Sequence, residues 1–176
     1  MKNKFGFITI LLALSFVAVA CQPPQSTKET NMTISSPAFE ANGPIPRQYT
    51  CDGQNINPPL KFGGLPADAK SLALIVDDPD APNGTFVHWV VADIPAGTTM
   101  VNEHDPLAQA TAGRNGSGKT GYTGPCPPSG THHYHFKLFA LDTLLNLSQP
   151  DAKQLEEAMQ SHIMGQTELV GVYQRQ

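Results

Sequence analysis

The sequence predicts a mostly β fold, a β-sandwich with one or two short helices. Three observations carry this prediction. The 176 residues include 16 prolines and 15 glycines, which favour many turns between strands. Between those turns lie short stretches with the apolar pattern of strands. Only one stretch, near the C-terminus, has a convincing helical period, and no internal repeat or second domain divides the chain.

Residues 1–20 have the pattern of a secretory signal peptide. Lys2 and Lys4 precede an apolar run that ends in Ala18-Val19-Ala20. Cys21 follows directly, which also resembles a bacterial lipoprotein signal, in which this cysteine carries the lipid with acyl chains such as palmitate. Because such signals prefer leucine where this chain has Ala18, ordinary cleavage after Ala20 is the alternative.

Residues 21–31 comprise the cysteine to be lipidated and a polar segment with two prolines, the composition of a disordered tether. The folded domain is then expected to span residues 32–176. We therefore expect the domain to be anchored by lipid to a membrane of the bacterial cell envelope, on its periplasmic or extracellular face.

Five stretches are predicted to be strands, because their residues alternate or run apolar between turn signals. In the fourth, Tyr134, Phe136, Leu138 and Ala140 share one face, since successive strand side chains point to opposite faces. The five stretches are residues 32–36, 71–76, 86–94, 134–141 and 168–173.

One helix is predicted to begin after Asp151. This residue can cap the helix N-terminus, with Gln154 three residues later, as in a capping box. Gly165 suits a left-handed exit from the helix. We expect about three turns that lie on a sheet. The apolar face would be made by Leu155, Ala158, Met159 and Ile163.

Charge and cysteine content narrow the classes of function. Charged residues make up 15% of the chain and the net charge is -4, so no basic patch for nucleic acid is expected. With Cys21 lipidated, Cys51 and Cys126 remain in an exported chain, where disulfides persist. A bridge between them would close a long loop and contribute about 4 kcal/mol to stability. Two free thiols are the alternative.

Residues 113–120, with the sequence GRNGSGKT, match the P-loop pattern letter for letter. A working P-loop needs a strand before it and a helix after it, so that the helix N-terminus faces the phosphates. Residues 103–112 lack an apolar strand pattern, and the prolines and glycines of residues 121–130 prevent a helix. We therefore interpret the segment as a glycine-rich loop without nucleotide chemistry.

Metal and nucleophile patterns are also weak. Asp78-Pro79-Asp80 resembles the start of a calcium loop, but Pro82 stands where Asp or Asn is needed. His132, His133 and His135 lack the paired spacing of a zinc site. No Gly-x-Ser-x-Gly elbow is present. The sequence therefore predicts no metal, no cofactor and no enzyme activity.

Several short segments combine prolines and glycines with Asp, His and Tyr. They are residues 78–82 (DPDAP), His88 before Trp-Val-Val, and residues 124–134 (GPCPPSGTHHY), together with 49–53 (YTCDG), 57–60 (NPPL) and 168–173 (ELVGVY). In this combination they resemble the phosphatidylethanolamine-binding protein family, in its bacterial branch of Raf-kinase-inhibitor-like proteins. The resemblance covers residues 32–176.

The resemblance implies a β-sandwich with a small pocket that takes phosphate-like anions. Carried over by motif, the pocket is lined by Asp78, His88, His132 and Tyr134, and its rim is shaped by Pro127 and Gly130. The family often has arginine where this chain has His133, so one fixed positive charge is absent. Asp78 is expected to orient His88 or His132.

We therefore expect a membrane-tethered binding protein for phosphate or phospholipid-headgroup-like ligands. Two alternatives remain open. Relatives in the family inhibit kinases or proteases, which allows a protein-interaction module with such a partner. The His/Asp pocket also allows a hydrolase. A homodimer is left open, and no nucleic-acid partner is expected.

Overall fold

The computed structural model describes residues 31–175, which form eight strands, one α-helix and one short 3-10 helix. The predicted signal peptide, the lipid site Cys21 and the tether up to residue 30 lie outside the described residues. The elements are β1 (Thr33–Ser35), η1 (Arg47–Tyr49), β2 (Leu60–Gly63), β3 (Ser71–Asp78), β4 (Phe86–Pro95), β5 (Met100–Val101), β6 (Thr111–Ala112), β7 (Thr131–Leu141), α1 (Ala152–Met159) and β8 (Ile163–Gln174).

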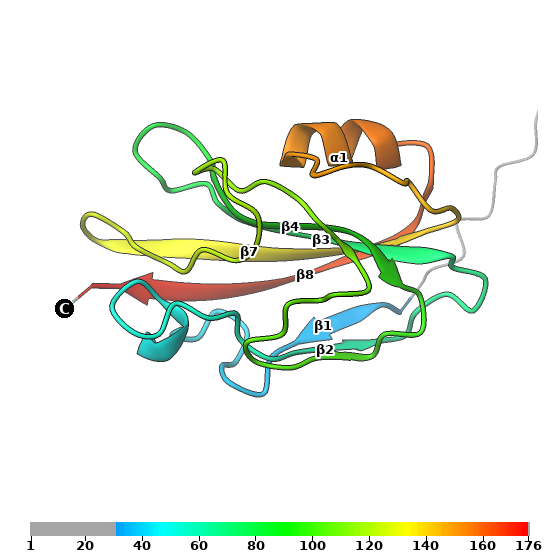
Figure 1. Cartoon of the computed structure of the whole chain (residues 1–176). Helices are drawn as coiled ribbons and strands as arrows, with labels where there is room; N and C mark the ends of the chain where they lie inside the picture. The colour runs from blue at the N-terminus through cyan, green and yellow to red at the C-terminus, as the bar shows by residue number, and fades with distance from the viewer. Residues whose placement is uncertain (1–30, 176) are drawn as a thin grey trace, which may run out of the picture.

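Two antiparallel sheets pack face to face (Figure 1). The larger sheet has the strand order β6-β4-β3-β7-β8, and the smaller has the order β1-β2-β5. α1 lies on the outer face of the larger sheet, away from the smaller one. The predicted mostly β sandwich with short helices is confirmed.

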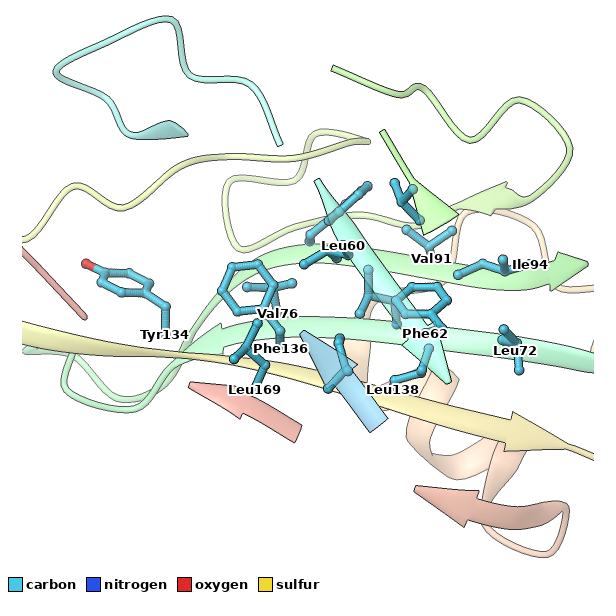
Figure 2. Packing of buried hydrophobic residues seen from close by; sticks show 14 of the residues in the cluster. Leu60, Phe62, Leu72, Val76, Val91, Ile94, Tyr134, Phe136, Leu138 and Leu169 are labelled. Carbon is cyan, nitrogen blue, oxygen red and sulfur yellow. The ribbon is translucent and has the colours of Figure 1, made fainter. Parts of the chain in front are cut away.

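The larger sheet is covered on both faces, and its central strand β3 is buried along its whole length. Leu72, Leu74 and Val76 belong to the core between the sheets, together with Leu60 and Phe62 of β2. Figure 2 shows Leu72 and Val76 there. Ala73 and Ile75 point to the other side, toward α1. A strand covered on both faces must be apolar throughout, which explains its unbroken apolar sequence. Each fully buried side chain of this size contributes roughly 1.5–3 kcal/mol.

β7 places the core and one candidate site residue on the same face. Tyr134, Phe136, Leu138 and Ala140 are buried in the core between the sheets, as predicted. His132 precedes Tyr134 by two residues, so it faces the same side and is buried near the start of the strand. His133 points to the opposite face and is exposed.

The predicted helix is correct at its start and wrong at its end. Asp151 and Gln154 form the expected capping box. The helix stops at Met159, however, and both Ile163 and Gly165 belong to β8. The cause is strand pairing, because β8 runs antiparallel to β7 along nearly its whole length and satisfies its backbone groups there.

The smaller sheet was largely missed from sequence. Its strands β2 and β5 span four and two residues, too few for a periodic pattern to emerge. β1 was predicted, and it pairs with β2 from Thr33 to Ser35. Within residues 31–175, no helix is long and apolar enough to cross a bilayer.

Candidate functional site

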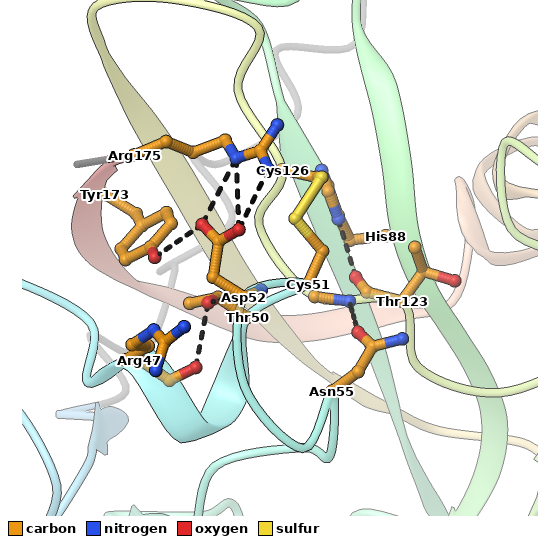
Figure 3. The surroundings of a disulfide bond; sticks show 11 residues. Arg47, Thr50, Cys51, Asp52, Asn55, His88, Thr123, Cys126, Tyr173 and Arg175 are labelled. Carbon is orange, nitrogen blue, oxygen red and sulfur yellow. Dashed lines mark hydrogen bonds and ion pairs between the residues drawn. A yellow bond between two sulfur atoms is a disulfide. The ribbon is translucent and has the colours of Figure 1, made fainter.

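A disulfide joins Cys51 to Cys126, with the two Cα atoms 5.4 Å apart (Figure 3). The predicted bridge is therefore confirmed. It fastens the segment after Tyr122 to the turn that follows η1. Two hydrogen bonds add to the connection: the Cys51 amide donates to the Pro125 carbonyl at 3.0 Å, and the Gly124 amide donates to Asn55 Oδ1 at 2.7 Å. We name residues 121–128 the pocket wall.

A pocket of about 450 Å³ opens beside this wall. Four of the predicted site residues line it: Asp78, His88, Pro127 and His132. They come from the ends of β3, β4 and β7 and from the wall. The apolar part of the lining, most of it not predicted from sequence, includes Ala81, Pro82, Phe86 and Pro128. The pocket thus has a buried polar floor and a mixed rim, to which Asn83, Thr85 and Ser117 also contribute.

Asp78 and His132 form a buried pair on the pocket floor. Asp78 Oδ2 lies 2.7 Å from His132 Nδ1, and the two side chains are only 5% and 8% exposed. The second carboxylate oxygen, Oδ1, accepts from the Asp80 amide at 2.9 Å and closes the Asp78-Pro79-Asp80 turn. Because Nδ1 donates to the carboxylate, the nitrogen left for a ligand is Nε2. Asp78 therefore pairs with His132, one of its two expected partners.

Asp80 makes the corresponding pair on the opposite face of β7. Its Oδ2 lies 2.7 Å from His133 Nδ1 and 2.9 Å from the His133 amide nitrogen. The hydrogen bonds from the His133 ring and then from its amide hold the pKa of Asp80 below its usual value. His133, which stands where the family often has arginine, is 51% exposed and does not line the pocket.

His88 is fixed by the wall. Its Nδ1 lies 2.6 Å from the Thr123 carbonyl oxygen (Figure 3). The Thr123 amide donates back to the His88 carbonyl at 2.9 Å. A carbonyl can only accept, so Nδ1 carries the proton and Nε2 is the free nitrogen. Burial lowers the pKa of His88, and the hydrogen bond to Thr123 only partly offsets that effect. His88 is therefore neutral at physiological pH.

Two predicted site residues lie away from the pocket lining. Gly130 is exposed in the turn before β7, where its φ of 71° favours glycine. Tyr134 packs edge-on against His88, with ring centroids 5.2 Å apart. Its hydroxyl is buried and is the one sealed side-chain polar atom among residues 31–175 that has no hydrogen-bond partner. Burial raises the pKa of this hydroxyl, so Tyr134 stays protonated.

The segment that matched the P-loop pattern is a turn organised by Asn115. The buried Asn115 side chain accepts from the amides of Ser117 and Lys119 at 3.0 and 3.2 Å. Its Nδ2 donates to Thr123 Oγ1 at 2.9 Å and to the Gly121 carbonyl at 3.1 Å. No helix follows, so the rejection of a P-loop is confirmed. Sequence reasoning missed Asn115, although an Asn-Gly pair is a turn signal.

Asn115 therefore reaches the pocket through Thr123, whose carbonyl orients His88. We expect Asn115→Ala to lower the free energy of unfolding by about 2 kcal/mol, because several buried hydrogen bonds are lost. It should also weaken anion binding, because the wall no longer fixes His88. Thermal melts and calorimetric titration with phosphate measure the two effects.

Thr123→Val is the matched control for Asn115→Ala. It removes only the Oγ1 acceptor and keeps the carbonyl that binds His88. Its effect on phosphate binding should be the smaller of the two. An Asn115→Ala protein that binds phosphate as well as the unchanged chain would contradict this role.

The pocket lining contains neither Lys nor Arg. Its charged or titratable groups are Asp78, His88 and His132. Within residues 31–175, no group of three or more His, Cys, Asp or Glu side chains is placed to hold a metal ion. What this arrangement offers is two imidazole Nε2 atoms, each on a ring anchored through Nδ1.

Comparison with known proteins agrees with this architecture. The sequence pattern of the phosphatidylethanolamine-binding protein family matches residues 35–174. A UPF0098 protein of Pyrococcus horikoshii is 52% identical over 176 residues, which cover 94% of this chain and 87% of the relative. A UPF0098 protein of Methanothermobacter thermautotrophicus is 49% identical over 150 residues, which cover 82% of this chain and 99% of the relative.

Solved structures show the same fold. A phosphatidylethanolamine-binding protein homologue from Chlamydia trachomatis superposes with a TM-score of 0.81 at 39% identity, covering 84% of this chain and 99% of that one. Escherichia coli YBCL, described as a member of the mammalian family, gives a TM-score of 0.77 at 28% identity, with coverage of 82% and 99%. This chain belongs to the phosphatidylethanolamine-binding protein family.

Proposed function

We propose that this chain is a non-enzymatic binding protein of the bacterial Raf-kinase-inhibitor-like branch, and that its pocket takes phosphate or a phospholipid-headgroup-like anion. The observation that carries the proposal is the pair of buried imidazoles, His88 and His132, on one pocket. Each uses Nδ1 to bond a fixed protein acceptor, which leaves Nε2 for the ligand. Once the rings are protonated, both Nε2 atoms can donate to the oxygens of one small anion.

Anion binding requires that the imidazoles of the pocket take up protons. Because the lining has no Lys or Arg, the positive charge can come only from protonated imidazoles. Asp78 pairs with His132 at 2.7 Å, whereas burial keeps His88 neutral in the free protein. A bound anion favours the imidazolium form and raises the pKa of His88 in the complex. Anion binding and proton uptake are therefore coupled.

Anion affinity is thus expected to rise as the pH falls. The pKa of His88 is lowered in the free protein and raised in the complex. The anion affinity therefore changes with pH mainly between the pKa of the free state and that of the bound state. We expect sulfate, whose charge is constant in this range, to bind about tenfold more tightly at pH 5.5 than at pH 7.5. Isothermal titration calorimetry at both pH values measures this, and equal affinities would refute the proposal.

Two variants sharpen the pH test. His88→Phe removes the coupled imidazole and should abolish most of the pH dependence. His135→Gln removes a histidine on the outer face of the sheet, where it pairs with Glu168 at 2.9 Å, and should leave the pH dependence unchanged. Phosphoethanolamine and inorganic phosphate, titrated in parallel, distinguish a headgroup ligand from free phosphate.

The Asp78–His132 pair also suits a general base, which makes a hydrolase the second candidate. Under our proposal the chain releases no phosphate from 4-nitrophenyl phosphate. Turnover that disappears in His132→Ala would replace binding by hydrolysis.

The membrane anchor is part of the proposal and is supported by the sequence around Cys21. Lipidation would hold the pocket close to phospholipid headgroups. Mass spectrometry of the mature N-terminus distinguishes a lipid-bearing Cys21 from simple cleavage after Ala20.

A further inference from the structure

A second cavity, of about 550 Å³, lies on the other side of the pocket wall. Gly121 and Tyr122 line this cavity, whereas Thr123 and Gly124 line the anion pocket. The rest of the cavity lining comes from β4, from Ala112 of β6, from Thr120 and from the loops around Asn57 and Leu107. We name it the Trp89 cavity, after the β4 side chain in its lining.

Asn57 presents a buried acceptor to this cavity. The residue is only 4% exposed, and its Nδ2 donates to the carbonyls of Pro58 at 3.1 Å and Asn102 at 2.9 Å. Both partners are acceptors, so the orientation of the amide is fixed and Oδ1 must point away from them. No group of residues 31–175 donates a hydrogen bond to this oxygen. The oxygen also keeps some accessible surface, because among residues 31–175 the Tyr134 hydroxyl is the only fully buried side-chain polar atom that has no partner.

Trp89 presents a donor in the same way. The residue is 3% exposed, and its ring meets Tyr122 edge-on at a centroid distance of 5.6 Å. Within the described residues its indole N–H has no acceptor. The nitrogen is not fully buried, so it keeps some accessible surface. Because Trp89 is in the lining of this cavity, we infer that its N–H is reached from there. Buried indole N–H groups normally have a partner, so this one is open for a ligand.

The lining of the cavity favours an uncharged ligand over an anion. Its titratable side chains include Asp105 and His104, and it contains neither Lys nor Arg. Asp105 Oδ1 is already used by the Leu107 amide at 2.9 Å. Ile56, Val91, Pro106 and Leu107 supply apolar surface around the two polar groups. A fitting ligand is uncharged, brings one acceptor and one donor, and has an apolar body.

We propose that the Trp89 cavity binds an uncharged amide, as found in a peptide segment of a partner protein. The amide oxygen accepts from the Trp89 indole N–H, and the amide N–H donates to Asn57 Oδ1. Each buried group then obtains the partner that it lacks. This site is independent of the proposed anion pocket, since no residue lines both.

The chain has a single tryptophan, so its indole N–H gives one assignable signal in a 15N-edited NMR spectrum. N-acetylalanine N-methylamide is the probe, with D-glucose as the hydroxyl comparison. The amide should shift the indole signal saturably, with a dissociation constant on the order of 1 mM, as expected for a small fragment. D-glucose should cause no saturable shift.

Three variants decide the result. Ala112→Phe fills the cavity from an exposed position of β6 and should abolish amide binding. Trp89→Phe removes the indole donor and should weaken binding about tenfold, followed through the Tyr122 amide signal. His132→Ala should abolish phosphate binding and leave amide binding unchanged. This variant therefore distinguishes a failure of the anion proposal from a failure of the amide proposal.

The proposal is overturned if the amide gives no saturable shift. It is also overturned if binding persists unchanged in both Ala112→Phe and Trp89→Phe. A saturable shift with D-glucose alone would refute the amide as the ligand class.

Discussion

Replacing both Cys51 and Cys126 by serine is expected to lower the free energy of unfolding by about 4 kcal/mol. The bridge closes a loop with a sequence separation of 75 residues, and its loss returns that conformational freedom to the unfolded chain. Urea unfolding followed by circular dichroism measures the change. An unfolding midpoint equal to that of the unchanged chain would contradict it.

A reductant supplies the matched control for the cysteine variant. Dithiothreitol should destabilise the unchanged chain toward the stability of the double variant, and it should leave the variant itself unaffected. Because Cys126 lines the proposed anion pocket, phosphate binding is expected to weaken along with stability. The hydrogen bonds that still hold the pocket wall, such as the one from the Gly124 amide to Asn55 at 2.7 Å, should keep the fold intact.

Asp78→Ala is expected to cost about 3 kcal/mol of unfolding free energy, because it leaves His132 buried without its charged partner. The closure of the turn through the Asp80 amide is lost as well. Anion binding should fall with stability, since the His132 ring loses the carboxylate that orients it. Chemical unfolding and phosphate titration measure the two losses.

Asp80→Ala is the matched control on the same turn. Asp80 meets His133 at the same 2.7 Å, but the two side chains are 42% and 51% exposed. Exposed pairs contribute little, so we expect a cost below about 1 kcal/mol and unchanged phosphate affinity. Equal costs for the two alanine variants would show that burial does not set the strength of the Asp78–His132 pair.

Long elements of this fold could be predicted from sequence, and short ones could not. β3, β4 and β7 have eight to eleven residues, enough for an apolar run or an alternation to be clear. β5 and β6 have two residues each and exist only through their pairing partners. The helix end at Met159 was missed for a related reason, because Ile163 fits a helical face equally well until β7 is known to lie beside it.

The candidate site was predicted in part for similar reasons. Asp78, His88 and His132 stand beside rigid turns and strand ends, and the fold brings all three to one pocket. Tyr134 shares the face of His132 but lies deeper, against His88, which alternation alone does not reveal. Asn115 bonds the Thr123 side chain, and the Thr123 carbonyl bonds His88, which lies 35 residues earlier. No local pattern marks this connection to the pocket.

The pairing of β3 with β7 has a consequence for how the molecule acquires its site. Partners in this pairing are 58 to 70 residues apart, from Asp77 with His135 to Ser71 with Leu141. Such non-local contacts slow folding, since a long loop must close before any of them forms. A nascent chain that ends before β7 has Asp78 without His132. The pocket that contains Asp78 and His132 is therefore complete only after β7 has paired with β3.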